Sequence, residues 1–314
     1  MTTWRQSKDF WQKLLGLLPR ALSTSRLKLG HRRAIAIGSG ILFALAISIW
    51  GTPSTAQQLQ VTPANPKLGD TLSVTIQQFT GSVAPTVKMG DKTYQTFEIE
   101  PNTYRALLPT TPLEKPGVRQ MQVAMGQEVQ NLTVTVANRT FPTQRIRLSG
   151  GGLEATQHEL DRVNAFKQLV TPEKYWNGPF LAPNQGRIST GYGIRRYYNG
   201  VFANDYYHRG VDYAGGYGSP VVAPAAGKVA LVGRVNEGFR VHGNIVGIDH
   251  GQGVTSVYLH LSRINVQEGD FVRAGQPIGA IGSTGASTGP HLHWGLYVNG
   301  QSVDPVPWRT QGVK

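Results

Sequence analysis

Apolar and polar residues alternate in short runs along much of the chain from Leu59 onward. The segments Leu72–Ile76 and Leu132–Val136 alternate residue by residue, which is the period of a strand with one buried face. Proline, Gly-Asp and Pro-Gly turn signals separate these runs. Several short strands at this spacing are typical of a sandwich. We therefore predict an immunoglobulin-like β-sandwich over residues 57–137.

Residues 138–184 have a different pattern and form the predicted linker. Apolar residues recur at helical spacing from Leu153 to Val170, and Thr171-Pro172 follows them, so one amphipathic helix is expected here. His158 lies on this helix among three acidic residues: Glu154, Glu159 and Asp161. We interpret this group as a solvated face.

Residues 185–314 return to strand patterns. The runs 227–233, 244–249 and 255–260 are rich in β-branched and aromatic residues, and glycine-containing turns separate the shorter runs after them. A compact antiparallel β domain is expected. The fold class is mainly β.

The first 56 residues form a basic leader with an apolar run. Residues 1–33 contain eight Lys or Arg and one Asp, a net charge of 8 − 1 = +7, and Ala34–Trp50 is uncharged. Basic residues before an apolar run place the N-terminus in the cytoplasm. Cleavage after Ala56 or retention as an anchor in the inner membrane both fit. We expect export to the periplasm or cell envelope.

Composition limits the chemistry. The chain has no cysteine, which excludes disulfides, thiol catalysis and Cys-ligated zinc. Since +7 of the net charge of +13 lies in the leader, the remainder of 13 − 7 = +6 does not indicate nucleic-acid binding. A modest positive surplus suits an anionic polymer such as a cell wall.

Histidines provide the candidate site. Six of the 8 histidines lie in residues 185–314, and His291 and His293 flank a leucine in a predicted strand. Side chains alternate along a strand, so these two imidazoles share a face. His208 and Asp212 are four residues apart, and with one further histidine they would supply the three protein ligands of a catalytic zinc.

Three motifs in order resemble those of the lysostaphin/LytM-type zinc endopeptidases of bacterial cell walls. They are His208-x-x-x-Asp212, Tyr258-Leu259-His260-Leu261-Ser262, and the run from Gly282 to His293. The resemblance extends from about Arg187 to Trp308. It implies that His208, Asp212 and His293 bind Zn²⁺, and that His260 and His291 flank the bound water and the scissile carbonyl. Many relatives have Glu or another polar residue two places after the last ligand, where this chain has Trp294-Gly295.

The chemistry of the residues agrees with this resemblance. There is no His-Glu-x-x-His motif to supply a glutamate base, so imidazoles near the metal must move the proton. We favour His291 as the base.

The predicted activity is hydrolysis of peptidoglycan stem peptides or cross-links during cell-wall remodelling. Two alternatives remain open: a non-catalytic wall-binding module that activates another hydrolase, and a protease acting on extracellular proteins. The N-terminal module is expected to dock, to act as a spacer or to inhibit. The sequence gives no oligomeric state.

Overall fold

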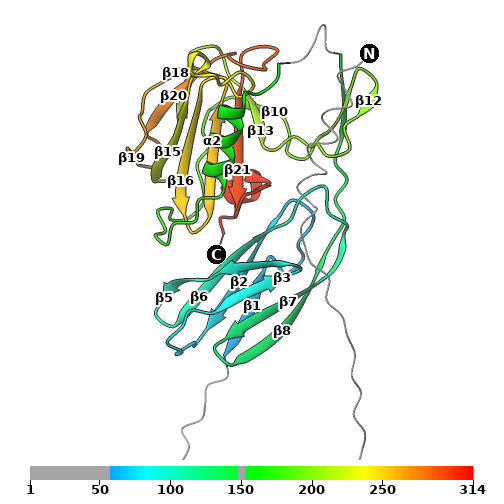
Figure 1. Ribbon diagram of the computed structural model, residues 1–314, viewed down its shortest axis with the longest axis vertical. Coiled ribbons are helices and arrows are strands. Elements are labelled where there is room, and N and C mark those ends of the chain that lie inside the picture. Colours follow the sequence, from blue (N-terminus) through cyan, green and yellow to red (C-terminus); the bar gives the residue numbers. More distant parts are fainter. Residues whose placement is uncertain (1–56, 148–152, 314) are drawn as a thin grey trace, which may run out of the picture. The chain divides into compact units, whose positions relative to one another are not determined.

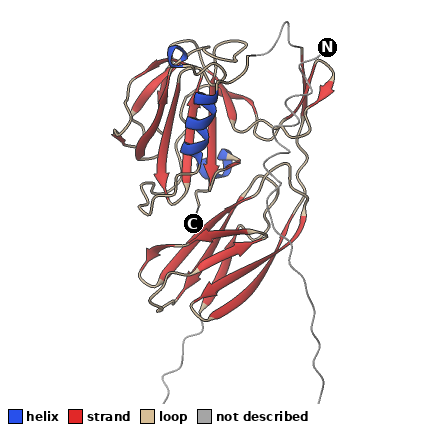
Figure 2. Ribbon diagram, in the orientation of Figure 1, coloured by secondary structure: helices blue, strands red, loops and turns tan. Residues whose placement is uncertain are grey.

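The computed structural model describes residues 57–147 and 153–313. Strands form most of this part of the chain, with few helices (Figure 2). None of the helices within these two ranges is long and apolar enough to cross a membrane. The predicted leader, including Ala34–Trp50, lies outside the described residues.

The N-terminal module consists of two antiparallel four-stranded sheets. One has the order β1-β2-β6-β5 and the other β4-β3-β7-β8. The strands are β1 (Gln58–Thr62), β2 (Thr71–Gln77), β3 (Thr86–Met89), β4 (Lys92–Gln95), β5 (Phe97–Glu100), β6 (Thr103–Pro109), β7 (Gly117–Met125) and β8 (Glu128–Val136).

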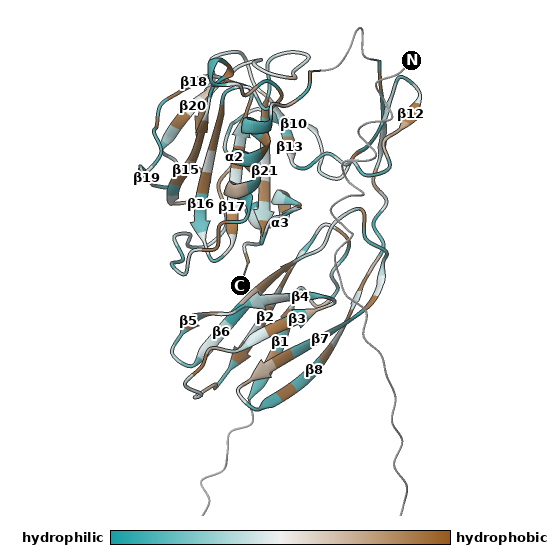
Figure 3. Ribbon diagram, viewed as in Figure 1, coloured by the Kyte–Doolittle hydropathy of each residue, from teal (hydrophilic) through white to brown (hydrophobic). Residues whose placement is uncertain are grey.

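Side chains from both sheets form one core. Leu72 and Ile76 of β2 are fully buried with Val87 of β3 and Met121 of β7. Hydrophobic residues recur along these strands (Figure 3), as the alternating pattern predicted. The module is therefore a β-sandwich, and its immunoglobulin-like topology stays a prediction.

A larger antiparallel sheet organises the C-terminal part. Its order is β10-β13-β21-β17-β16-β15-β19, and β22 pairs with β21. The strands are β10 (Arg187–Thr190), β13 (Val211–Ala214), β15 (Gly227–Gly233), β16 (Ile245–Gly251), β17 (Val254–Leu259), β19 (Phe271–Val272), β21 (Leu292–Val298) and β22 (Gln301–Val303). The expected strands at 227–233, 244–249 and 255–260 correspond to β15, β16 and β17 within one or two residues.

Two small three-stranded sheets complete this part. One has the order β14-β20-β18 and the other β12-β11-β9. Their strands are β9 (Thr143–Ile146), β11 (Arg195–Tyr198), β12 (Val201–Phe202), β14 (Pro220–Val222), β18 (Leu261–Ile264) and β20 (Pro277–Ile281). Because β9 pairs in parallel with β11, the segment that leaves the sandwich is hydrogen-bonded to the chain just before His208.

Helix α2 (Gln157–Lys167) lies against one face of the large sheet (Figure 1). Its Val163 and Phe166 pack with residues from four strands: Leu231, Ile245, Val257 and Tyr297. The helix is shorter than predicted. The prediction of a solvated face is wrong at Glu159, whose side chain is fully buried. It is buried because its carboxylate accepts hydrogen bonds from the backbone of residues 240–242.

Polar contacts join the sandwich to the C-terminal part. Arg105 of β6 is 3% exposed and donates to Gln252 at 2.9 Å. The Arg139 guanidinium lies 2.7 Å from the carboxylate of Asp304, which also caps helix α3 (Pro305–Thr310). Asn299, immediately after β21, donates to the carbonyl of Leu107 at 2.7 Å. These contacts lie near the C-terminal end of β21, whereas His293 is near its beginning.

Candidate metal centre and active site

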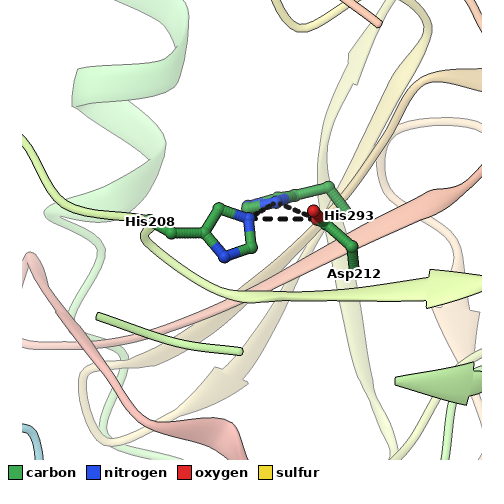
Figure 4. A group of neighbouring side chains, drawn as sticks. All are labelled: His208, Asp212 and His293. Atoms are coloured by element: carbon green, nitrogen blue, oxygen red, sulfur yellow. Dashed lines mark hydrogen bonds and ion pairs between the residues drawn. The ribbon is translucent and has the colours of Figure 1, made fainter. Parts of the chain in front are cut away.

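Strand register brings the predicted ligands together. Asp212 of β13 is directly paired with His293 of β21, and paired residues present their side chains on the same face about 5 Å apart. His208 precedes β13, and its ring points at the other two side chains (Figure 4). Leu259, the last residue of β17, pairs with His293 on its other side, so His260 follows at the edge of the same site.

The three ligand atoms form a nearly equilateral triangle. His208 Nε2 is 3.0 Å from Asp212 Oδ1 and 3.0 Å from His293 Nδ1, and these last two atoms are 2.9 Å apart. A tetrahedral zinc with bonds of about 2.1 Å separates its ligand atoms by about 3.4 Å. The three atoms are slightly closer together than in such a zinc site, and all three side chains point toward the same place.

Hydrogen bonding shows why a cation fits. His208 Nδ1 lies 2.7 Å from the carbonyl oxygen of Gly191 and must donate its proton there, which leaves Nε2 as a lone pair in the neutral ring. Asp212 is also an acceptor, so the His208–Asp212 contact has no proton of its own. A metal ion relieves this repulsion, and a carbonyl on the far nitrogen is the usual way to orient a metal-bound histidine.

The pKa shifts agree with this donor set. Burial alone would raise the pKa of Asp212, but contacts with His208 and His293 outweigh burial and hold the pKa far below its usual range. Burial lowers the pKa of His293 to about 4, although Asp212 opposes the shift. Asp212 and His293 are therefore deprotonated at neutral pH, as metal ligation requires. They form a group that could hold a metal ion.

The two predicted catalytic histidines lie beside this triangle. The rings of His260 and His291 have centroids 4.8 Å apart, and His291 Nε2 is 4.0 Å from Asp212 Oδ1. Each ring donates from Nδ1 to a backbone carbonyl, of Thr284 at 2.8 Å and of Gly289 at 2.9 Å. In both, Nε2 is left as the proton acceptor.

The two histidines differ in exposure. His260 is 7% exposed, and burial together with the nearby imidazoles lowers its pKa to about 3. His291 has a side-chain exposure of 20%, against 3% for His208 and 12% for His293. Solvent therefore reaches the site most readily at His291.

The remaining histidines of this domain are not part of the triangle. His250 donates to the carbonyl of Ala226 and contacts Ser256, which agrees with a structural role. His242 Nδ1 is 2.6 Å from Glu159 Oε1. Sequence patterns gave no indication of this pair, because its members are 83 residues apart.

Comparison with known proteins identifies the C-terminal part. Residues 206–305 match peptidase family M23. The chain is 44% identical over 120 residues to the DD-carboxypeptidase/endopeptidase Mpg of Neisseria meningitidis serogroup B, a match that covers 38% of this chain and 26% of that protein. It is 44% identical over 123 residues to lysostaphin of Staphylococcus staphylolyticus, covering 38% of this chain and 25% of lysostaphin. The chain thus spans about a quarter of the length of these relatives.

A solved structure extends the similarity beyond this domain. An M23 peptidase from Pseudomonas aeruginosa superposes with a TM-score of 0.60 at 26% identity, covering 79% of this chain and 96% of that one. Residues 206–305 therefore form a peptidase M23 domain. The family resemblance and the mainly β fold class are confirmed.

Proposed function

We propose that this protein is an exported zinc metalloendopeptidase that hydrolyses peptide bonds in peptidoglycan. The observation that supports this most directly is the convergence of His208, Asp212 and His293 atoms without enough protons to bond one another. The name of the Neisseria relative supports the substrate class, because bonds between D-centres occur in peptidoglycan stem peptides. The basic, apolar leader supports export.

Each residue of the site has a distinct proposed role. His208, Asp212 and His293 would hold Zn²⁺, which polarises the scissile carbonyl and acidifies water when it is bound. His291 Nε2 accepts the proton of the attacking water, because its Nδ1 proton is committed to Gly289. His260, kept neutral by burial, orients the same water through its own Nε2.

The test is muropeptide release from purified peptidoglycan by the full chain in mild detergent, with and without a zinc chelator. Mass spectrometry of the products identifies the bond that is cut. We expect chelator-sensitive cleavage and one zinc per chain. A zinc-loaded chain that releases nothing would contradict the proposal and favour the alternative role of activating another hydrolase.

Three variants separate the proposed roles. Asp212→Ala should lose both zinc and activity, whereas His291→Ala should keep zinc and lose about 10²- to 10⁴-fold in rate as a missing general base. His158→Ala, an exposed histidine on α2, is the matched control and should change neither. If Asp212→Ala keeps both zinc and activity, the assignment of ligands is wrong.

A further inference from the structure

A buried carboxylate on the linker helix α2 contacts a loop, residues 240–242, that also contacts His260. Glu159 is fully buried in the first turn of α2. Its oxygens accept from three consecutive backbone N–H groups, of Arg240 at 3.0 Å, Val241 at 3.0 Å and His242 at 2.7 Å. The His242 imidazole adds a fourth contact at 2.6 Å. Successive N–H groups of this kind form an anion-binding nest, here filled by the protein itself.

Helix α2 contacts this loop through a second residue, Thr156, in addition to Glu159. Thr156, the N-cap of α2, accepts from Glu159 N and donates to the carbonyl of Gly238 at 2.9 Å. Burial by itself would raise the pKa of Glu159, but the side chain and backbone of His242 and the backbone of Val241 lower it to about 2. The carboxylate is therefore charged at neutral pH, and charge-assisted hydrogen bonds are the stronger kind.

The other side of the loop supports His260. The carbonyl of His242 accepts from His260 N at 3.1 Å, and the carbonyl of Val241 accepts from Ala286 N at 2.9 Å. Ala286 lies two residues after Thr284, whose carbonyl accepts from His260 Nδ1. Residues 240–242 thus connect Glu159 to the His242 carbonyl, which holds the His260 backbone, and to the loop whose Thr284 carbonyl holds the His260 ring.

His260 needs such support because its backbone is strained. Its φ is +64°, a left-handed conformation that costs a non-glycine residue of the order of 1 kcal/mol or more. Strained residues of this kind persist where the surrounding structure holds them.

We propose that Glu159 is a positioning residue for His260, acting through the nest of residues 240–242. The inference rests on the proposed function for its effect on rate, but its structural part does not. It also implies that the catalytic unit includes the linker helix, since Glu159 lies outside the family match at 206–305. Glutamine at this position would keep the shape of the side chain. Its amide NH₂ group, however, would face the backbone N–H donors of residues 240–242, which it cannot accept from.

The test compares Glu159→Gln with Asp161→Asn in the full chain. Asp161 lies on the same helix and is exposed, so its variant should match the wild type. For Glu159→Gln we expect kcat to fall about 10- to 100-fold, as for other residues that orient site groups, with KM within about twofold and zinc content unchanged. Amide hydrogen exchange at His260 should accelerate at least about tenfold. Exchange at Val257, in the preceding strand β17, should stay the same.

The exchange measurement needs no substrate, so it distinguishes the two proposals. If the wild type is inactive but exchange at His260 accelerates in Glu159→Gln, the proposed function fails and the positioning role stands. Unchanged exchange at His260, or a lower melting temperature with unchanged kcat and KM, would overturn the positioning role. Should Glu159→Gln fail to fold, Glu159→Asp keeps the charge but is one methylene shorter, and it should show the same pattern to a smaller degree.

Discussion

Gly210 provides the most direct test of how the backbone positions the predicted metal ligands. It lies between His208 and Asp212 and packs against β21. A Cβ atom built on it would lie 2.3 Å from the carbonyl oxygen of Trp294 and 2.9 Å from His293 Nε2. One neighbour is backbone and the other is the ring of a predicted ligand, so neither can rotate away as the end of a flexible side chain would.

The size of the effect follows from these distances. Real Cβ contacts essentially never fall under 3.0 Å, so Gly210→Ala must push β13 and β21 apart locally by at least about 0.7 Å (3.0 − 2.3 Å). Metal sites tolerate deviations of about 0.2 Å in ligand distance. We therefore expect zinc affinity to fall by about 10- to 100-fold, at least as much as when a group that orients a ligand is removed.

Competition with a chromophoric chelator measures this affinity in the full chain. Gly216→Ala is the matched control, because a Cβ on Gly216 would meet nothing within 4 Å, and its affinity should equal that of the wild type. Wild-type zinc affinity in Gly210→Ala would refute the argument that strand packing at this glycine fixes the ligand geometry.

Three further predictions concern stability. The folded-state pKa of Glu159, about 2, lies below its ordinary value of 4.5. The charged carboxylate therefore contributes about 3 kcal/mol to the free energy of unfolding above pH 4.5, and this contribution is lost between pH 4.5 and 2. The difference in unfolding free energy between the wild type and Glu159→Gln should shrink over that range, and a constant difference would contradict the reasoning. Arg105→Ala should lower the unfolding free energy by about 2 kcal/mol in urea titrations, since it leaves Gln252 without its buried donor, whereas Arg187→Ala, at an exposed strand position, should change it by less than about 0.5 kcal/mol. A zinc chelator should lower the melting temperature of the wild type but not that of Asp212→Ala; an equal decrease in both would show that the chelator acts elsewhere.

Sequence patterns predicted the parts of the fold that depend on local order. Alternation in Leu72–Ile76 corresponds to β2, and the run 227–233 corresponds to β15. The spacing of three motifs named five side chains that the structure brings together, although their roles stay predictions.

Long-range partners could not be predicted from local patterns. The acidic residues beside His158 have the spacing of a solvated helix face, and nothing nearby indicates that Glu159 is buried. Its partners are backbone N–H groups 81 to 83 residues away, which any residue type except proline could supply. Similarly, helical spacing from Leu153 to Val170 suggested a longer α2, but Leu153 and Val170 are 58% and 41% exposed, and the helix ends where burial ends.

The pairing of Asp212 with His293 has an evolutionary consequence. Backbone hydrogen bonds of β13 and β21, not the side chains at the site, hold these two strands together. Replacing either residue would therefore remove a predicted metal ligand while the pairing of the two strands was retained. The architecture of this domain and its proposed chemistry can therefore change independently in evolution.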